Sequence, residues 1–227
     1  MPVRFTVVRG SWRSPCLYRD GLGELRGVLA SDGTRLELEL RGVEFMGRDF
    51  DALEPVACRE PAELARFRFA SGCLCSCRLE LGIPIRLRVD AAVREASLDV
   101  ELVLGDPRPD GGLQEERLRL ALELDGRVIA SSGRSAWFED ELSELAATLP
   151  PETRFASCFS CGLSDYSPYG HAIFGALACF RDVAAEYRAV SNKVELFALW
   201  DKHSGFVQET ALCERFEPRR PGTGYRG

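Results

Sequence analysis

The sequence predicts an α+β fold that is mostly β: an antiparallel β-sandwich or flattened barrel with one clear helix and a Cys-rich C-terminal segment. From Phe5 to about Ala130, apolar and polar residues alternate in short segments, as in strands with one buried face. Beyond Ser132 the pattern changes to a helical stripe, followed by a stretch rich in cysteine. We therefore expect a β-rich body over residues 1–131 and a mixed segment over residues 132–227, packed together as one globular unit.

The strands are predicted from four alternating segments, which are 35–45 (RLELELRGVEF), 77–89 (CRLELGIPIRLRV), 97–104 (SLDVELVL) and 117–130 (RLRLALELDGRVIA). Asp32-Gly33 and Asp125-Gly126 lie beside or within such segments. Both dipeptides are typical of hairpin turns, because glycine adopts a positive φ at low cost. A longer connection is expected over residues 105–112 (GDPRPDGG).

The clearest helix is predicted by an apolar stripe at i, i+4, i+7 and i+11, formed by Phe138, Leu142, Leu145 and Leu149. Pro150 and Pro151 should end it. Three acidic residues, Glu139 to Glu141, fall in its first turn, where the helix dipole stabilises carboxylates. Further on, residues 194–200 and 206–212 are predicted to pair as a hairpin, and the tail RRPGTGYRG is predicted to be solvated.

Composition limits the classes of function. The formal net charge of −6 argues against a protein that works by neutralising phosphates, so nucleic acid is an unlikely partner. Arg4 and Arg9 interrupt the stretch where a secretory apolar core would lie, and the longest apolar run, AIFGALACF, is about half of the roughly 20 residues that span a bilayer. We expect a cytoplasmic protein without membrane contact, whose partner is an unknown protein or small molecule.

The cysteine pattern points to zinc. Cys158 and Cys161 form a C-x-x-C pair, the spacing with which two thiolates bind one ion on a tight turn. Gly162 follows directly and is expected to let the backbone direct N–H groups at the sulfurs. Two later cysteines would complete the site. The preferred ligands of a structural zinc ion are therefore Cys158, Cys161, Cys179 and Cys213. Cys77 is the first reserve, from a CLCSC stretch that also holds Cys73 and Cys75.

Three other interpretations stay open. The cysteines could be small buried hydrophobic side chains, or a redox pair, although GLSDYSPYG after the pair is a poor helix former. A nucleophilic cysteine could work with His171 or His203. An enzyme, hydrolase-like, would have its site around Asp165, Tyr166 and His171, which also form a possible ligand rim. No complete set of nucleophile, base and oxyanion donors is readable, so a zinc-stabilised binding or regulatory module is favoured, with no catalytic residue assigned.

Five ordered motifs carry a resemblance: GRSAWFEDEL, CFSCGLSDYSPYG, FGALACFR, VQETALC and FEPRRPGTGYRG. Together they resemble a bacterial family known as a domain of unknown function (number 6304). The resemblance covers most of the chain and is strongest from Ser132 to the end. Members read SGWFED where this chain has SAWFED, and a lysine follows CFR closely where this chain has Ala184-Ala185. The resemblance implies no activity, substrate or fold.

Overall fold

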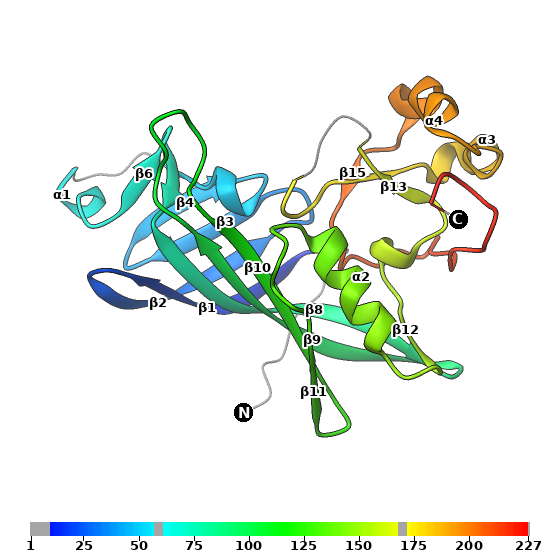
Figure 1. The fold of residues 1–227 in the computed structure, drawn as a ribbon, viewed down its shortest axis with the longest axis horizontal. Coiled ribbons are helices and arrows are strands. Elements are labelled where there is room, and N and C mark those ends of the chain that lie inside the picture. Colours follow the sequence, from blue (N-terminus) through cyan, green and yellow to red (C-terminus); the bar gives the residue numbers. More distant parts are fainter. Residues whose placement is uncertain (1–9, 57–60, 168–171, 227) are drawn as a thin grey trace.

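A ten-stranded antiparallel sheet forms the body of the molecule, shown as a computed structural model in Figure 1. The structure describes residues 10–56, 61–167 and 172–226. Along the sheet the strand order is β11-β10-β9-β8-β1-β2-β3-β4-β5, and β12 pairs with β8. These strands are β1 (Trp12–Asp20), β2 (Gly23–Ser31), β3 (Leu36–Leu40), β4 (Val43–Gly47), β5 (Glu54–Pro55), β8 (Cys77–Val89), β9 (Ala92–Leu104), β10 (Glu116–Leu124), β11 (Arg127–Ala130) and β12 (Thr153–Phe155).

The predicted fold class is confirmed as antiparallel and mostly β, and the described part of the sheet is not closed into a barrel. Asp125 and Gly126 both have positive φ and join β10 to β11, as the sequence predicts. The segment 35–45 is a hairpin rather than one strand. Its alternation breaks at Arg41 and Gly42, which both have positive φ and let Leu40 pair with Val43.

The sheet forks between its two central strands. β1 and β8 pair only from Cys16 to Arg19. Further toward the start of β1, Ser14 Oγ accepts a hydrogen bond from Gly82 N at 3.3 Å instead of a ladder bond. The C-terminal part of the chain enters this fork, because Trp12 Nε1 donates to Gln208 Oε1 at 3.0 Å. The fork therefore attaches the end of the chain to the middle of the sheet.

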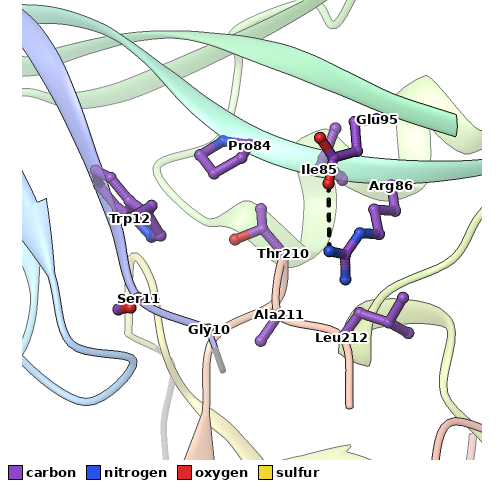
Figure 2. Close-up of a pocket in the computed structure, with 10 residues that line it drawn as sticks. All are labelled: Gly10, Ser11, Trp12, Pro84, Ile85, Arg86, Glu95, Thr210, Ala211 and Leu212. Carbon is purple, nitrogen blue, oxygen red and sulfur yellow. Dashed lines mark hydrogen bonds and ion pairs between the residues drawn. The ribbon is translucent and has the colours of Figure 1, made fainter. Parts of the chain in front are cut away.

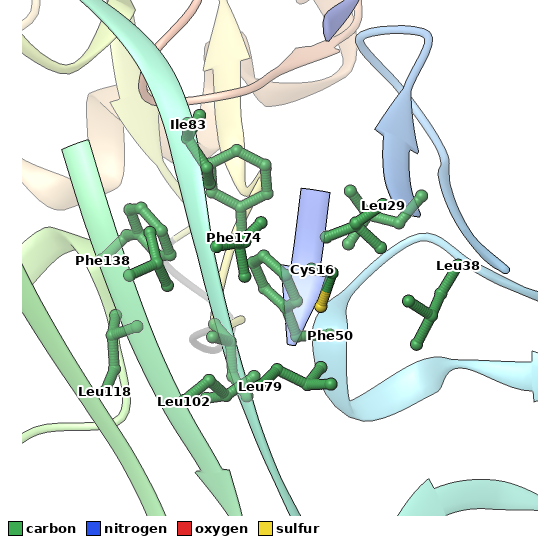
Figure 3. Close-up of a cluster of buried hydrophobic side chains, with 14 of the residues drawn as sticks. Cys16, Leu29, Leu38, Phe50, Leu79, Ile83, Leu102, Leu118, Phe138 and Phe174 are labelled. Carbon is green, nitrogen blue, oxygen red and sulfur yellow. The ribbon is translucent and has the colours of Figure 1, made fainter. Parts of the chain in front are cut away.

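The main core lies on the inner face of the sheet (Figure 3). Leu79, Leu102 and Leu118 form one cross-strand row in β8, β9 and β10, and all three are fully buried. A cluster of aromatic rings crosses the core between segments far apart in sequence. The ring centroids of Phe138 and Phe174 are 4.6 Å apart, and those of Phe50 and Phe174 are 5.5 Å apart. The core therefore includes residues from both parts of the chain.

Smaller elements complete the body. Helix α2 (Phe138–Thr148) begins at the residue predicted for it and buries Phe138, Leu142 and Leu145. It packs on β10 and β11, as Figure 1 shows. The others are η1 (Phe50–Ala52), α1 (Pro61–Leu64), β6 (Arg68–Ala70) and β7 (Cys73–Cys75).

Residues 156–226 are called here the Cys-rich segment, and those that the structure describes form short elements only. These are η2 (Cys158–Ser160), β13 (Ser164–Tyr166), β14 (Leu177–Cys179), η3 (Arg181–Val183), α3 (Ala184–Arg188), α4 (Lys193–Leu199), η4 (Trp200–Lys202) and β15 (Phe206–Val207). β13, β14 and β15 form a separate three-stranded sheet. No helix among the described residues has the length and apolar character needed to cross a membrane.

The predicted hairpin of residues 194–200 and 206–212 is wrong, because the first of these segments is helix α4. Asn192 caps the helix by accepting a hydrogen bond from Glu195 N at 3.0 Å. Glu195 in turn accepts from Ser191 N at 2.7 Å. This reciprocal arrangement resembles a capping box, which favours a helix over a strand despite the alternating pattern.

Candidate functional site

The C-x-x-C pair lies on a single tight turn. Cys158 begins η2, and Cys161 N donates to Cys158 O at 3.1 Å. Ser164 Oγ fixes the turn by donating to Cys158 O at 2.6 Å. Cys179 ends β14 directly opposite Ser164 of β13, so the small sheet carries it next to the pair. Cys213 comes close to the pair because Ala211, two residues earlier, accepts a hydrogen bond from Cys158 N at its carbonyl oxygen, at 2.6 Å.

The structure brings the four predicted cysteines into one neighbourhood. Burial raises the pKa of the Cys158 thiol well above its ordinary value, and the neighbouring thiols of Cys161, Cys213 and Cys179 raise it further. Burial also raises the pKa of Cys179, with smaller contributions from Cys161 and Cys213. Cys213 is exposed, whereas the other three are buried. Every cysteine among the described residues is a free thiol.

These thiols are neighbours without forming a tetrahedron. Within residues 10–56, 61–167 and 172–226, no group of three or more His, Cys, Asp or Glu side chains has the arrangement that holds a metal ion. Cys77, the reserve ligand, lies elsewhere: its thiol interacts electrostatically with Cys75 and Cys16 in the body. The CLCSC stretch therefore belongs to a second, separate group of thiols.

Gly162 has a different role from the one predicted. Its N–H donates to Glu217 O at 2.7 Å rather than pointing at a sulfur. A Cβ at Gly162 would lie 3.3 Å from the Cα of Arg219 and 3.4 Å from the carbonyl oxygen of Pro218. The glycine therefore lets the end of the chain pass close to the cysteine turn.

The predicted solvated tail is only partly confirmed: Arg220, Gly222 and Tyr225 are exposed, whereas two of its arginines are packed against the protein. Arg219 Nη2 donates to the carbonyl oxygens of Cys161 at 2.7 Å and Ser164 at 2.6 Å. The guanidinium of Arg226 lies 4.7 Å from the ring centroid of Tyr166, a cation–π distance. The tail therefore holds the cysteine turn and β13 from outside, and sequence alone gave no signal for these contacts.

Asp165 and Tyr166 are buried, with exposed fractions of 1% and 9%. Asp165 Oδ1 accepts from Tyr166 N at 2.9 Å and Oδ2 accepts from the Tyr187 hydroxyl at 3.0 Å. Burial raises the pKa of Asp165, while Arg226, the Tyr187 hydrogen bond and Arg219 oppose that rise. Asp165 therefore has a structural environment. His171, the third member of the predicted rim, lies outside the described residues.

The second histidine has a local structural role. His203 Nδ1 accepts a hydrogen bond from Gly205 N at 3.0 Å. Its ring centroid lies 4.8 Å from that of Phe206 and 5.8 Å from that of Trp200. These contacts place it in an aromatic cluster at the end of α4 and η4.

Two buried carboxylates, which the sequence analysis did not identify, bind the stretch of chain just before β14. Asp49 accepts hydrogen bonds from Ile173 N at 2.8 Å and Phe174 N at 3.0 Å. Glu209 accepts from the next two N–H groups, Gly175 N at 2.7 Å and Ala176 N at 3.4 Å. Four successive backbone N–H groups are thus bound by two side chains, an arrangement called here the carboxylate clamp.

Burial raises the pKa of both carboxylates of the clamp to about 7, although the hydrogen bonds from backbone N–H groups oppose that rise. Asp51 raises the pKa of Asp49 further, and Asp49 raises that of Glu209. The clamp thus combines a strong set of hydrogen bonds with a cost of burying charge.

A small cavity of about 30 Å³ lies in the fork of the sheet, between Trp12, Ile85 and Thr210 (Figure 2). Its volume is room for about two water molecules. Beside the cavity, Arg86 forms an ion pair with Glu95, with 3.3 Å between Nη2 and Oε1. The cavity is therefore a packing gap where the end of the chain enters the sheet.

Comparison with known proteins gives one relationship. A family model described as "Family of unknown function (DUF6304)" matches residues 12–164. The motif GRSAWFEDEL lies within the matched residues and CFSCGLSDYSPYG begins there, whereas the other three motifs lie beyond it. No curated protein and no solved structure matches the chain.

Proposed function

We propose that this chain, which belongs to the Family of unknown function (DUF6304), is a binding or regulatory module whose Cys-rich segment is held together by a zinc ion. The observation that carries the proposal is that the η2 turn, β14 and the stretch after β15 bring four thiols, from three separate stretches of chain, into one neighbourhood. They are Cys158 and Cys161, Cys179, and Cys213. An ion bound to all four would link η2, β14 and the stretch after β15.

The need for such a staple follows from how the Cys-rich segment is built. Its own apolar clusters are small: one joins Cys158 and Tyr166 with Ala176 and Leu177, and the other surrounds Phe180 and Tyr187. Small units with little regular structure often depend on a metal for stability. An ion at the four thiols would link these two small clusters, because Cys161 belongs to one and Cys158 to the other.

The chemistry of the four side chains suits zinc. Because burial raises the pKa of Cys158 and Cys179, these thiols hold their protons at neutral pH, and the cation would displace them on binding. Four thiolates at about 2.3 Å form a closed tetrahedron with no position for substrate, which makes the ion structural. Cys213 lies outside helix and strand and is exposed, so it is the ligand with most room to adjust.

The test is elemental analysis of protein purified without chelator. The wild type should contain about one zinc per chain, and Cys161→Ser should lose both the metal and cooperative unfolding. Cys16→Ser is the matched control, since Cys16 is also a buried thiol but belongs to the body. It should keep the zinc. A wild type with no more zinc than Cys161→Ser would overturn the proposal and leave the cysteines as buried thiols.

The alternative, a hydrolase-like enzyme with a site around Asp165, Tyr166 and His171, has less support from the geometry. Both carboxylate oxygens of Asp165 are bonded within the protein, and its side chain is shielded from solvent. A general base has to reach the proton that it removes. The binding module is therefore the better account of these residues.

A further inference from the structure

A cleft of about 430 Å³ lies between the body and the Cys-rich segment. Its walls come from the loop before β3, the residues after β4, and the Cys-rich segment on the far side, where Phe174 and Phe206 line it. The volume falls in the range of small-molecule sites, about 300–1,000 Å³. Clefts between two packed parts of a chain are common places for such sites.

Two arginines of the body line the cleft at neighbouring positions of the β3–β4 hairpin. Leu36 pairs with Gly47 at the end of the β3–β4 ladder, so Arg35 and Arg48 occupy the next opposed positions. Opposed residues of an antiparallel pair point to the same side, and like charges there repel. Both arginines line the cleft and both are exposed.

Within the described residues, no carboxylate forms an ion pair with either arginine. The Arg35 guanidinium contacts the sulfur of Met46 at 3.1 Å. Asp32 interacts electrostatically with Arg35, but its Oδ1 already accepts from Thr34 N and Arg35 N, each at 2.8 Å. The charge of the two guanidinium groups is therefore only partly offset.

Asp49 also lines the cleft but does not neutralise the arginines. Its Oδ1 accepts from Phe50 N at 2.7 Å and from Phe174 N, and its Oδ2 accepts from Ile173 N. All three bonds hold the carboxylate toward the protein interior, where it is 8% exposed. The cleft is left with a positive end.

The Cys-rich segment contributes an aromatic side chain to the cleft. Phe206 is 48% exposed, and it lines the cleft. Its ring packs with His203 and Trp200, whose ring centroids lie 4.8 Å and 6.3 Å from its own. An exposed aromatic ring and two guanidinium groups in one cleft suit a ligand with one anionic and one apolar end.

We infer that this cleft binds a small organic anion, whose carboxylate or phosphate group lies between Arg35 and Arg48 and whose apolar part lies against Phe206. The inference deepens the binding role proposed above and rests on it. It does not depend on zinc, so loss of metal in Cys161→Ser and loss of anion binding in an arginine variant are separate results.

The test is calorimetric titration of the full chain, at low ionic strength, with phenyl phosphate, benzoate and inorganic phosphate. Arg48→Gln should weaken binding of phenyl phosphate by about tenfold or more, because hydrogen bonds to a charged group are lost. Arg127→Gln, an exposed arginine at the start of β11, removes the same charge elsewhere and should change the affinity by less than about twofold. Comparing benzoate with phenyl phosphate identifies which anionic group the site prefers.

Phe206→Ala separates the two ends of the ligand. It should weaken binding of phenyl phosphate and leave that of inorganic phosphate unchanged. Equal losses in Arg48→Gln and Arg127→Gln would overturn the inference, as would the absence of binding by all three probes. Arg48 has no bonded partner among the described residues, so the far- and near-UV circular dichroism of Arg48→Gln should match the wild type and show that folding is retained.

Discussion

The carboxylate clamp should be a principal source of stability, and Asp49→Ala is the substitution that tests it. The carboxylate accepts hydrogen bonds from the N–H groups of Phe50, Ile173 and Phe174, at 2.7, 2.8 and 3.0 Å. These three residues are no more than 3% exposed, so their N–H groups have few alternative acceptors. Alanine would leave three buried N–H groups without a partner.

The expected loss follows from those three bonds. A buried polar group left unsatisfied costs about 1–3 kcal/mol, which gives about 3–9 kcal/mol for three. Removing the carboxylate also removes the cost of burying its charge, so we expect a net loss of about 3–5 kcal/mol. For a chain of this size, that corresponds to a decrease of roughly 10 °C in the melting temperature. Urea unfolding followed by circular dichroism measures the same quantity at constant temperature.

Two further variants make the result specific. Asp49→Asn keeps Oδ1 as the acceptor for Phe50 and Phe174 but turns an amide N–H₂ group toward Ile173 N, so its loss should be about half that of alanine. Asp51→Ala, in the same 3-10 turn, removes an equal charge from an exposed position and should change stability by less than about 0.5 kcal/mol. Similar losses in Asp49→Ala and Asp51→Ala would show that charge, rather than the three hydrogen bonds, controls this site.

The other two predictions concern Glu209 and the end of the chain. Burial raises the pKa of Glu209 from 4.5 to about 7, so between these pH values the folded protein holds a proton that the unfolded chain releases. The protonated Glu209 therefore stabilises the fold at low pH, and this stabilisation is lost as the pH rises toward 7. Glu209→Gln should flatten the decrease in free energy of unfolding between about pH 5 and 8, and an unchanged pH profile would contradict the assigned shift. Gly224→Ala should lower stability by about 1–3 kcal/mol more than Gly222→Ala, since both glycines have φ near +72° but only a Cβ at Gly224 would lie 2.8 Å from the Tyr187 ring. Equal losses in these two variants would mean that backbone strain alone matters.

The sequence predicts the body of this protein well because its signals are local. Alternation and Asp-Gly turns specify hairpins such as β10–β11, and a meander of hairpins needs little long-range information. The stripe beginning at Phe138 specifies α2 in the same way. Residues 194–200 show the limit of alternation alone, because the cap of Asn192 with Glu195, equally local, favours the helix.

The site could be predicted only in part. The C-x-x-C spacing and two later cysteines identify four thiols that the structure brings into one neighbourhood. In contrast, Asp49 contacts Ile173 across 124 positions, and no local pattern distinguishes it from a surface aspartate. The role of Gly162 was likewise hidden, because it depends on Arg219 and Pro218 arriving from the far end of the chain.

Asp49 links the stability of this fold to the chemistry of its cleft. Its neighbour Arg48 is exposed, and a nearby aspartate on an exposed loop would ordinarily offset such a charge. Here the aspartate side chain is turned inward by three backbone N–H groups, two of which belong to the Cys-rich segment. The bonds that attach this segment to the body therefore also hold the carboxylate away from the arginines. As a result, the same contact forms one wall of the cleft and preserves the positive charge at its end.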